Sequence, residues 1–292
     1  MRDQATTRIR RLNRAVTRET GALDTSYLGR GRPLGAARVL HLCSPDGSDV
    51  ALIRESLALD SGLLSRLLRS LESEGLVETR TDPTDRRRRV ACLTPLGQAE
   101  RAEYARLNED LAARLLSRAP RLRDQILSAV DLIANILNAD HIQITRADPD
   151  DPEVMAALAA YAAYLTATIP DEGPNPIPLP LPDADSYRPP QGAILLALSD
   201  GLTLGTVSLR PLAPGLGEVK RLYIAPSARG LGLARRLMRA IEGKARALGY
   251  RRLNLDTNGT LAAAVALYRS EGWQEIPPYS DFPATLWFSK AL

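Results

Sequence analysis

Residues 219–234 read VKRLYIAPSARGLGLA, and this stretch decides the fold of the C-terminal half. An apolar, strand-like run leads into a turn with two glycines, and we expect a helix over 231–248 after it. The backbone N–H groups at the start of a helix lack partners within the helix, and the helix dipole adds positive potential there. Glycine has no side chain, so a phosphate can approach the backbone closely. The pattern predicts a pyrophosphate-binding turn between a strand and a helix.

A dinucleotide-binding turn is the alternative, because a glycine-rich turn after a strand also opens that fold. Such a turn needs the spacing G-x-G-x-x-G and an acidic residue further along the chain. Here Gly230 and Gly232 are present, but Ala234 ends the motif too soon. The sequence therefore disfavours a nicotinamide or flavin dinucleotide as the ligand.

The Arg-Gly-x-Gly-x-Ala segment at 229–234 resembles the acyl-CoA motif of the GNAT N-acetyltransferases. Residues 266–273, ALYRSEGW, are similar to the Leu-Tyr-x-x-x-Gly-Phe element of that superfamily, with Trp273 in place of Phe. The resemblance covers about 141–292. It implies a mixed α/β fold with a central, mostly antiparallel sheet, acetyl-CoA as the acyl donor and no metal.

The resemblance also implies which residues hold acetyl-CoA. The main chain of Leu222, Tyr223 and Ile224 should hold the pantetheine arm like an added strand, and Asn258 is a further candidate for that arm. The expected pyrophosphate site comprises the turn and the first helical residues: Arg229, Gly230, Leu231, Gly232, Leu233 and Ala234.

Two residues are candidates for proton transfer, because a thioester is attacked by a neutral amine and releases a thiolate. By its place in the motif, Tyr268 should protonate the leaving thiolate; otherwise it is a packed helix residue. Glu218 lies where several GNAT members carry the base or anchor a water. It could instead contact the substrate's ammonium group or form a surface ion pair with Lys220.

The acceptor is poorly specified by the sequence, although a small-molecule amine is favoured over a protein. We expect the proline-rich segment 170–190 and residues 277–281 to wall the acceptor site. The side chains that could bind an acceptor carboxylate are Arg210, Lys220, Arg221 and Tyr279. Asp183 and Asp281 would equally favour a cationic acceptor.

The N-terminal half has the order of elements of a winged helix-turn-helix. Apolar periodicity, caps and turn residues predict helices at 3–20, 34–43, 50–57 and 61–74, strands at 76–80 and 88–93, and helices at 95–117 and 121–139. The fourth helix has one apolar stripe and offers polar residues on its other faces, which suits the DNA major groove. The ribbon tip, 86–89, carries four arginines that could enter a minor groove.

This half resembles the MarR family of transcriptional regulators over about 1–140. The similarity is carried by LLRSLESEGLV at 67–77, DPTDRR at 82–87 and LTPLG at 93–97. The resemblance implies a homodimer on a double-stranded DNA operator, with Asp85 orienting a wing arginine. The expected DNA-binding residues lie on the fourth helix and the wing: Ser61, Ser65, Arg66, Arg69, Asp85, Arg86 and Arg87.

Composition supports two domains, which we place at 1–140 and 141–292. The chain has 292 residues, 45% of them apolar, and residues 1–140 hold 23 arginines, no lysine and 19 acidic residues. Two cysteines, Cys43 and Cys92, exclude a disulfide scaffold and are expected to be small buried side chains. Two histidines argue against a His-rich metal site. We expect no signal peptide, no membrane span and a cytoplasmic protein.

Three hypotheses about function remain. The first is a bifunctional protein that binds an operator and acetylates a small amine. The second is a regulator whose acetyltransferase domain senses acyl-CoA or an amine without turnover. The third is an enzyme whose winged helix only dimerises it. The intact 229–234 motif and Tyr268 weigh against the second, and the basic wing weighs against the third.

Overall fold

The computed structural model describes residues 2–82, 85, 87–169, 177–281 and 284–292. Contacts divide the chain into two compact units, Met1–Arg123 and Asp124–Leu292, and each is described by itself. Sequence analysis put the boundary near residue 140 instead. The difference concerns helix α6 (Arg123–Leu137), whose Asn135 amide donates to the backbone and hydroxyl oxygens of Ser227 within the second unit.

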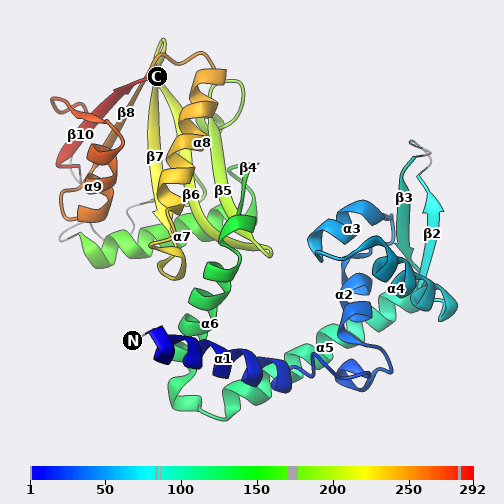
Figure 1. The fold of residues 1–292 in the computed structure, drawn as a ribbon. Helices are drawn as coiled ribbons and strands as arrows, with labels where there is room; N and C mark the ends of the chain where they lie inside the picture. The colour runs from blue at the N-terminus through cyan, green and yellow to red at the C-terminus, as the bar shows by residue number, and fades with distance from the viewer. Residues whose placement is uncertain (1, 83–84, 86, 170–176, 282–283) are drawn as a thin grey trace. The chain divides into compact units, whose positions relative to one another are not determined.

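The first unit is mostly helical, with one small sheet (Figure 1). Its elements are α1 (Arg2–Glu19), a 3-10 turn (Tyr27–Gly29), α2 (Leu34–Leu42), β1 (Ser48–Asp49), α3 (Val50–Ser56), α4 (Ser61–Ser73), β2 (Val77–Thr81), β3 (Arg89–Leu93), α5 (Pro95–Ser117) and a second 3-10 turn (Pro120–Leu122). These bounds confirm the winged helix-turn-helix order expected from the sequence.

Helix α4 is positioned by its apolar stripe. Leu64, Leu68 and Leu71 are buried in one core with residues of α2, while the other faces of α4 stay polar. The Asp60 side chain caps the helix by accepting the backbone N–H of Leu63 at 2.8 Å. Such a cap contributes about 1 kcal/mol. Local capping and packing thus hold α4 with its polar surface outward.

The wing is a three-stranded sheet in the order β1-β3-β2, all antiparallel. The sequence predicted its two long strands and missed β1, which has only two residues. Behind the wing, Gly97 near the start of α5 lies so close to β2 that a Cβ there would be 1.9 Å from the carbonyl oxygen of Leu76. Any larger residue would push α5 away from the wing.

The second unit holds a seven-stranded sheet with helices on both faces. After α6 and a 3-10 turn (Ala139–His141) come β4 (Gln143–Ala147), α7 (Pro152–Thr168), a 3-10 turn (Ala184–Tyr187), β5 (Ala193–Ser199), β6 (Leu202–Ala213), β7 (Leu216–Ile224), a 3-10 turn (Pro226–Ala228), α8 (Leu233–Ala247), β8 (Arg252–Thr257), α9 (Ala262–Ser270), β9 (Gln274–Glu275) and β10 (Leu286–Ala291). The strand order is β4-β5-β6-β7-β8-β10-β9, antiparallel except for the parallel pair β7–β8. The predicted mixed α/β fold with a mostly antiparallel sheet is confirmed.

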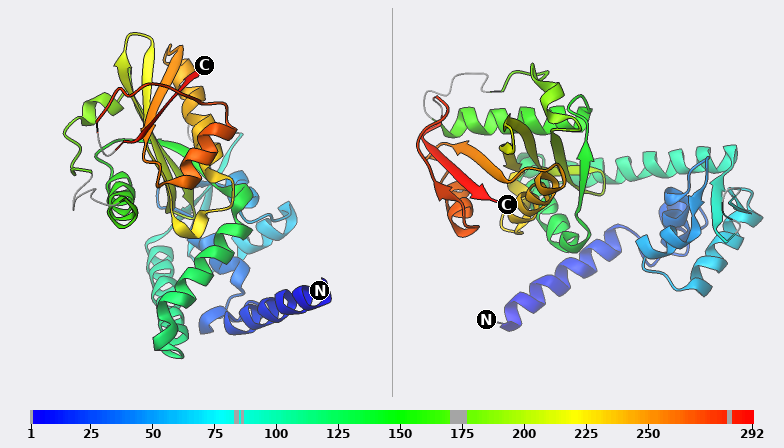
Figure 2. Two further views of the ribbon diagram at one scale, coloured as in Figure 1. Left: turned by 90° about the vertical axis from the view of Figure 1, so that its left-hand side faces the viewer. Right: turned by 90° about the horizontal axis from the view of Figure 1, so that it is seen from above.

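Alternating residues of the strands pack into two hydrophobic cores. On β5, Leu195 packs with the α8 side, whereas Ile194 and Leu196 pack with α7. Figure 2 shows the same arrangement, with α7 on one face of the sheet and α8 and α9 on the other. The period-2 alternation of a strand produces this division, because successive side chains point to opposite faces.

The sheet opens between β7 and β8. Their parallel ladder runs from Leu216 opposite Arg252 to Glu218 opposite Asn254 and then stops, although both strands continue. β7 also carries a bulge against β6 near Arg221, whose φ of +58° is unusual for a residue with a side chain. The end of β7 is therefore left without a β8 partner.

One expectation near this region differs from the structure. The helix predicted from residue 231 begins at Leu233, because Gly230 and Gly232 take φ values of +80° and +71° and cannot continue a helix. Of the proline-rich segment 170–190, residues 170–176 lie outside the described part, and Ala184–Tyr187 form a 3-10 turn.

Candidate functional sites

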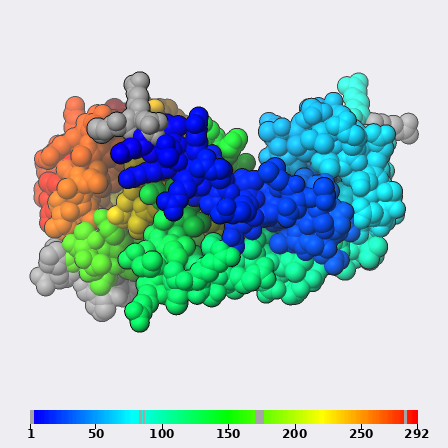
Figure 3. Space-filling model, turned by 60° about the horizontal axis from the view of Figure 1, so that its bottom comes forward, coloured from blue at the N-terminus to red at the C-terminus, as the bar shows by residue number. Residues whose placement is uncertain are grey.

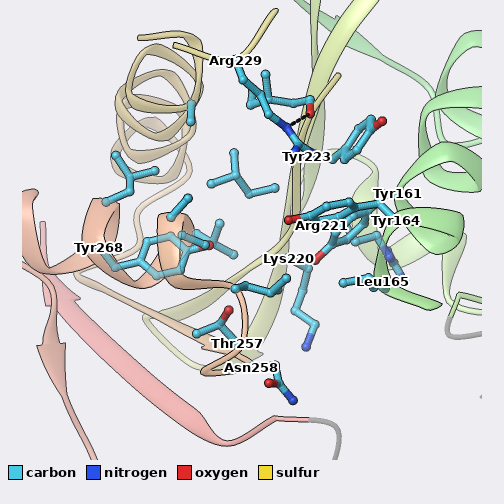
Figure 4. Close-up of a pocket in the computed structure, with 18 of the residues that line it drawn as sticks. Tyr161, Tyr164, Leu165, Lys220, Arg221, Tyr223, Arg229, Thr257, Asn258 and Tyr268 are labelled. Atoms are coloured by element: carbon cyan, nitrogen blue, oxygen red, sulfur yellow. Dashed lines mark hydrogen bonds between the residues drawn. The ribbon is translucent and has the colours of Figure 1, made fainter. Parts of the chain in front are cut away.

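A cavity of about 580 Å³ lies where β7 and β8 separate. Its walls come from the end of β7, the end of β8, the start of α8, one face of α9 and part of α7 (Figure 4). Every predicted cofactor residue lines this cavity except Leu231, which lies in the turn but not in the wall. The structure thus gathers the motif residues around one space.

The turn before α8 offers backbone donors to this cavity. Gly232 caps α8 in a left-handed conformation, and a Cβ added at Gly230 or Gly232 would meet no atom within 4 Å. The first N–H groups of the 15-residue helix are unpaired within it, and they point toward this turn. The Arg229 guanidinium donates to the carbonyl of Ile224 at 3.3 Å and stacks on the Tyr164 ring at 4.6 Å. This end of the cavity suits an anionic group.

Tyr268 lies on α9 with its hydroxyl toward the middle of the cavity (Figure 4). Its ring packs against Trp273 and Phe288, with centroids 6.2 and 5.7 Å away. Burial raises the pKa of the Tyr268 phenol well above its usual value, and the negative charge of Asp256 adds to the effect. The phenol keeps its proton throughout the ordinary pH range, so it is available as an acid. The Tyr268 ring is therefore packed against its neighbours, and the same side chain also lines the cavity.

Glu218 lies on β7 beneath the cavity and does not line it. Only 2% of its side chain is exposed. Its carboxylate accepts Arg210 Nε at 2.6 Å and the Tyr279 hydroxyl at 3.1 Å, and Lys220 Nζ lies 3.5 Å away. The ion pair with Lys220 considered from the sequence therefore exists, but it is buried rather than on the surface.

The four residues expected to bind an acceptor carboxylate already have partners of opposite charge or hydrogen-bond partners. Arg210 also pairs with Asp183 at 2.7 Å. Arg221 stacks on Tyr187 at 4.5 Å and lies 3.8 Å from Asp183. Of the four, only Lys220 and Arg221 line the cavity. Asp183 thus serves as a partner of arginines.

Two tyrosines in the wall, Tyr161 and Tyr164, were not predicted from the sequence. Tyr161 and Tyr164 on α7 lie beside Tyr223 on β7, with ring centroids 5.7 and 6.2 Å from it. The spacing of Tyr161 and Tyr164, three residues apart on a helix, was the available signal. Asp256, which lines the cavity at the end of β8, was not predicted either. Its position two residues after Asn254 on a strand was the signal there.

The described residues contain no group of three or more His, Cys, Asp or Glu side chains that could hold a metal ion. Within the same part of the chain, no helix has the length and apolar character needed to cross a membrane. Cys43 and Cys92 are both free thiols in buried positions.

The polar face of α4 is exposed in the first unit. Ser61, Ser65, Arg66 and Arg69 all lie on the surface, and Arg69 Nε donates to the Ser65 carbonyl at 3.2 Å. None of these four contributes to the buried core of the unit. The helix therefore presents hydroxyl and guanidinium groups outward.

In the wing, Asp85 and Arg87 are exposed, and Arg86 lies outside the described residues. Asp85 accepts the backbone N–H of Arg87 at 3.0 Å, so it shapes the turn that carries the arginines. Arg88, one of the four arginines at the ribbon tip, pairs with Asp49 of β1 at 2.6 Å.

Comparison with known proteins agrees with both halves. A model of the acetyltransferase (GNAT) family matches residues 158–273, and a MarR family model matches residues 30–88. An uncharacterized N-acetyltransferase of Schizosaccharomyces pombe is 39% identical over 141 residues, which cover 47% of this chain and 82% of that protein. The IAA acetyltransferase of Azospirillum brasilense is 31% identical over 52% of this chain and 99% of that protein.

Among solved structures, the acetyltransferase from Streptococcus agalactiae is 21% identical and covers 52% of this chain and 98% of that chain, with a TM-score of 0.44. The family assignment rests on the two sequence relatives and not on this structure. The chain belongs to the GNAT N-acetyltransferases and is an acyltransferase that carries a MarR family domain in its N-terminal half.

Proposed function

We propose that this protein is bifunctional: it binds a double-stranded DNA operator as a dimer and transfers an acetyl group from acetyl-CoA to a small-molecule amine. One observation carries the enzymatic half. The Gly230–Gly232 turn and Tyr268 open into the same cavity between β7 and β8. A donor bound there meets groups that bind an anion at one end and a proton donor at the other.

Acetyl-CoA fits the residues that line this cavity. Its pyrophosphate would lie at the start of α8, where unpaired N–H groups and the helix dipole favour an anion. Its pantetheine arm would take up the backbone groups of Leu222, Tyr223 and Ile224 that β8 leaves unpaired. Burial in this space would place the thioester near Tyr268, and Asn258 lies in the same wall.

DNA binding is proposed from the exposed face of α4 and the basic wing. Guanidinium groups such as those of Arg66 and Arg87 can contact phosphates or base edges. Because phosphate contacts release counterions, affinity should fall steeply as salt is raised. A cytoplasmic location, where DNA and acetyl-CoA are both available, is part of the same proposal.

Homodimer formation is proposed from exposed apolar residues on α1 and α6. Ile9, Leu12 and Val16 on α1 are 40–61% exposed, and Figure 3 shows α1 in dark blue on an open face. Helix α6 exposes Val130 and Ile136 in the same way. A second copy would cover such helices, which otherwise present apolar surface to water.

The alternative of a sensor without turnover predicts ligand binding but no acetyl transfer. A thiol-release assay with acetyl-CoA and a panel of small amines separates the two, when it is run beside a band-shift assay on the upstream promoter region. Acceptor-dependent thiol release together with operator binding is the expected result. Binding of acetyl-CoA with no release for any amine would leave only the sensor, and a lysine peptide in the panel tests for a protein acceptor.

The DNA half is tested with Arg66→Ala and Arg87→Ala. Each true groove contact should be worth about 1–3 kcal/mol of operator affinity. Arg106→Ala on α5 is the matched control, since it removes one exposed arginine away from α4 and the wing. Equal affinity of all three variants and the wild type would exclude the proposed face.

A further inference from the structure

The acceptor's amine must meet the thioester, and the geometry of β7 indicates where. In the proposed function, on which this inference rests, pyrophosphate lies at the turn that follows Ile224. The pantetheine arm would then run back along β7 toward Glu218 and Asn254, the last pair of the β7–β8 ladder before the strands separate. The four residue steps from Ile224 to Lys220 would span at most roughly 13 Å of extended strand. The reacting end of the donor is thus expected beside Lys220.

Asp256 is the carboxylate in the cavity wall at this depth. The ladder that pairs Glu218 with Asn254 would, if continued, place Lys220 opposite Asp256. Although the strands separate there, their side chains still meet: Lys220 Nζ donates to Asp256 Oδ1 at 2.7 Å. The Asp256 side chain is 15% exposed and lines the cavity.

A chain of hydrogen bonds fixes the Asp256 carboxylate. Trp287 Nε1 on β10 donates to Ser280 Oγ, and Ser280 Oγ donates to Asp256 Oδ2, each at 2.8 Å. A carboxylate has about four acceptor positions. The two protein donors therefore leave capacity for an ammonium group that enters from the cavity.

Glu218 is in a different situation. It lies outside the cavity wall, and Arg210, Lys220 and Tyr279 surround its carboxylate. A substrate could not reach this carboxylate without moving those side chains. Glu218 is well placed to hold Lys220 and Tyr279.

We propose that Asp256, rather than Glu218, receives the proton from the acceptor's ammonium group, and that Glu218 acts as a positioning residue through Lys220. Asp256 takes one N–H proton and passes it to solvent. The freed nitrogen lone pair forms the bond to the thioester carbonyl carbon, and the C–S bond breaks. The thiolate takes the Tyr268 proton, and the nitrogen's second surplus proton leaves to solvent, from which Tyr268 is reprotonated.

The groups that face Asp256 fit this role. Lys220 on β7 lies beside it, with Glu218 on the far side of the lysine. Tyr268 on α9 and Tyr279 in the 277–281 segment are close enough for the Asp256 charge to act on both phenols. The ammonium of Lys220 repels a second ammonium nearby, which favours loss of the acceptor's proton.

The test compares Asp256→Asn with Glu218→Gln in the full chain, using the panel amine with the highest wild-type rate. We expect Asp256→Asn to lower kcat/KM about 100-fold at pH 7, within the usual range for a general base. The loss should shrink as the pH passes the pKa of the free amine, because the amine then needs no base. Glu218→Gln should lose activity by the same factor at every pH. Asp185→Asn, an exposed acid that pairs with Arg188, is the control.

A constant loss in Asp256→Asn, or a pH-dependent loss in Glu218→Gln alone, would overturn the assignment. Acetyl-CoA affinity, measured by calorimetry, should match the wild type in Asp256→Asn. If the affinity differs, Asp256→Glu provides the test. This variant should keep the wild-type shape of the pH profile at a lower rate, and a flat profile would count against Asp256 as the proton acceptor. A wild-type protein that releases no thiol with any amine would refute the proposed function itself, and this inference with it.

Discussion

Arg210 and Glu218 form a largely buried ion pair across neighbouring strands, with Nε and Oε2 2.6 Å apart. They are direct partners in the β6–β7 ladder, so both side chains lie on one face of the sheet. Arg210 also binds Asp183 at 2.7 Å and so ties the segment before β5 to the sheet. Through Glu218, the pair also lies beside Lys220, which lines the cavity.

Removing one partner of this pair should destabilise the second unit. Arg210→Ala leaves Glu218 buried with only Lys220 and Tyr279, so we expect a loss of about 3 kcal/mol in the free energy of unfolding. Arg188→Ala leaves Asp148 and Asp150, which are 45% and 66% exposed and so remain hydrated, and it should cost less than about 1 kcal/mol. Urea denaturation of both variants measures this. Equal losses would show that burial of the Arg210 pair does not matter.

The phosphate site is tested at Gly232. Gly232→Asp adds a carboxylate where the pyrophosphate is expected and forces a side chain into a backbone conformation with φ of +71°. We expect acetyl-CoA binding to be lost. Gly243→Asp places the same charge on the exposed face of α8 and should bind normally. Calorimetry that finds wild-type affinity in Gly232→Asp would refute the assignment.

Tyr268→Phe isolates the hydroxyl, because the ring and its packing on Trp273 and Phe288 remain. Turnover should fall at least about tenfold, at the lower edge of typical acid–base contributions, with acetyl-CoA affinity nearly unchanged. Since burial raises the pKa of this phenol, the wild-type rate should show no loss from ionisation of Tyr268 up to pH 10. Wild-type turnover in the variant would return Tyr268 to a purely structural role.

The first unit has its own acid-sensitive contact. Hydrogen bonds from Arg30 and ion pairs with Arg30 and Arg32 lower the pKa of Glu100 to about 2. A carboxylate with a lowered folded-state pKa stabilises the fold above its unfolded-state pKa. That stability, about 3 kcal/mol, should therefore be lost as pH falls from about 4.5 toward 2.

Thermal unfolding of Glu100→Gln against pH checks this. The variant should be less stable than the wild type at pH 7, and the two should converge at low pH. Glu103→Gln, whose partner Arg106 is exposed, should change stability much less. A constant difference between Glu100→Gln and the wild type down to pH 2 would contradict the titration.

The motifs predicted the two folds because each motif is a run of consecutive residues. The turn at 229–234, the caps of α3 and α4 and the wing strands depend on local spacing and backbone conformation. The two-residue strand β1 was missed because it has too few residues to show alternation; it forms only by pairing with β3. The start of α8 was placed two residues early, because helical spacing does not reveal the left-handed glycines.

The candidate site was predicted less completely, since its polar contacts cross between strands. The register that sets Arg210 against Glu218 cannot be read from either strand alone. This register buries the Glu218 carboxylate, which the sequence offered as a candidate base or as part of a surface ion pair. Likewise, Asp256 becomes a site residue only because β8 runs parallel to β7 and then separates from it.

Acceptor-dependent release of CoA thiol by the wild-type protein tests the central claim most directly. With acetyl-CoA saturating and a panel of small amines, the account predicts thiol release that rises with the concentration of at least one amine and falls at least about tenfold in Tyr268→Phe. Tight binding of acetyl-CoA without any amine-dependent release would contradict it and would leave the cavity as a sensor.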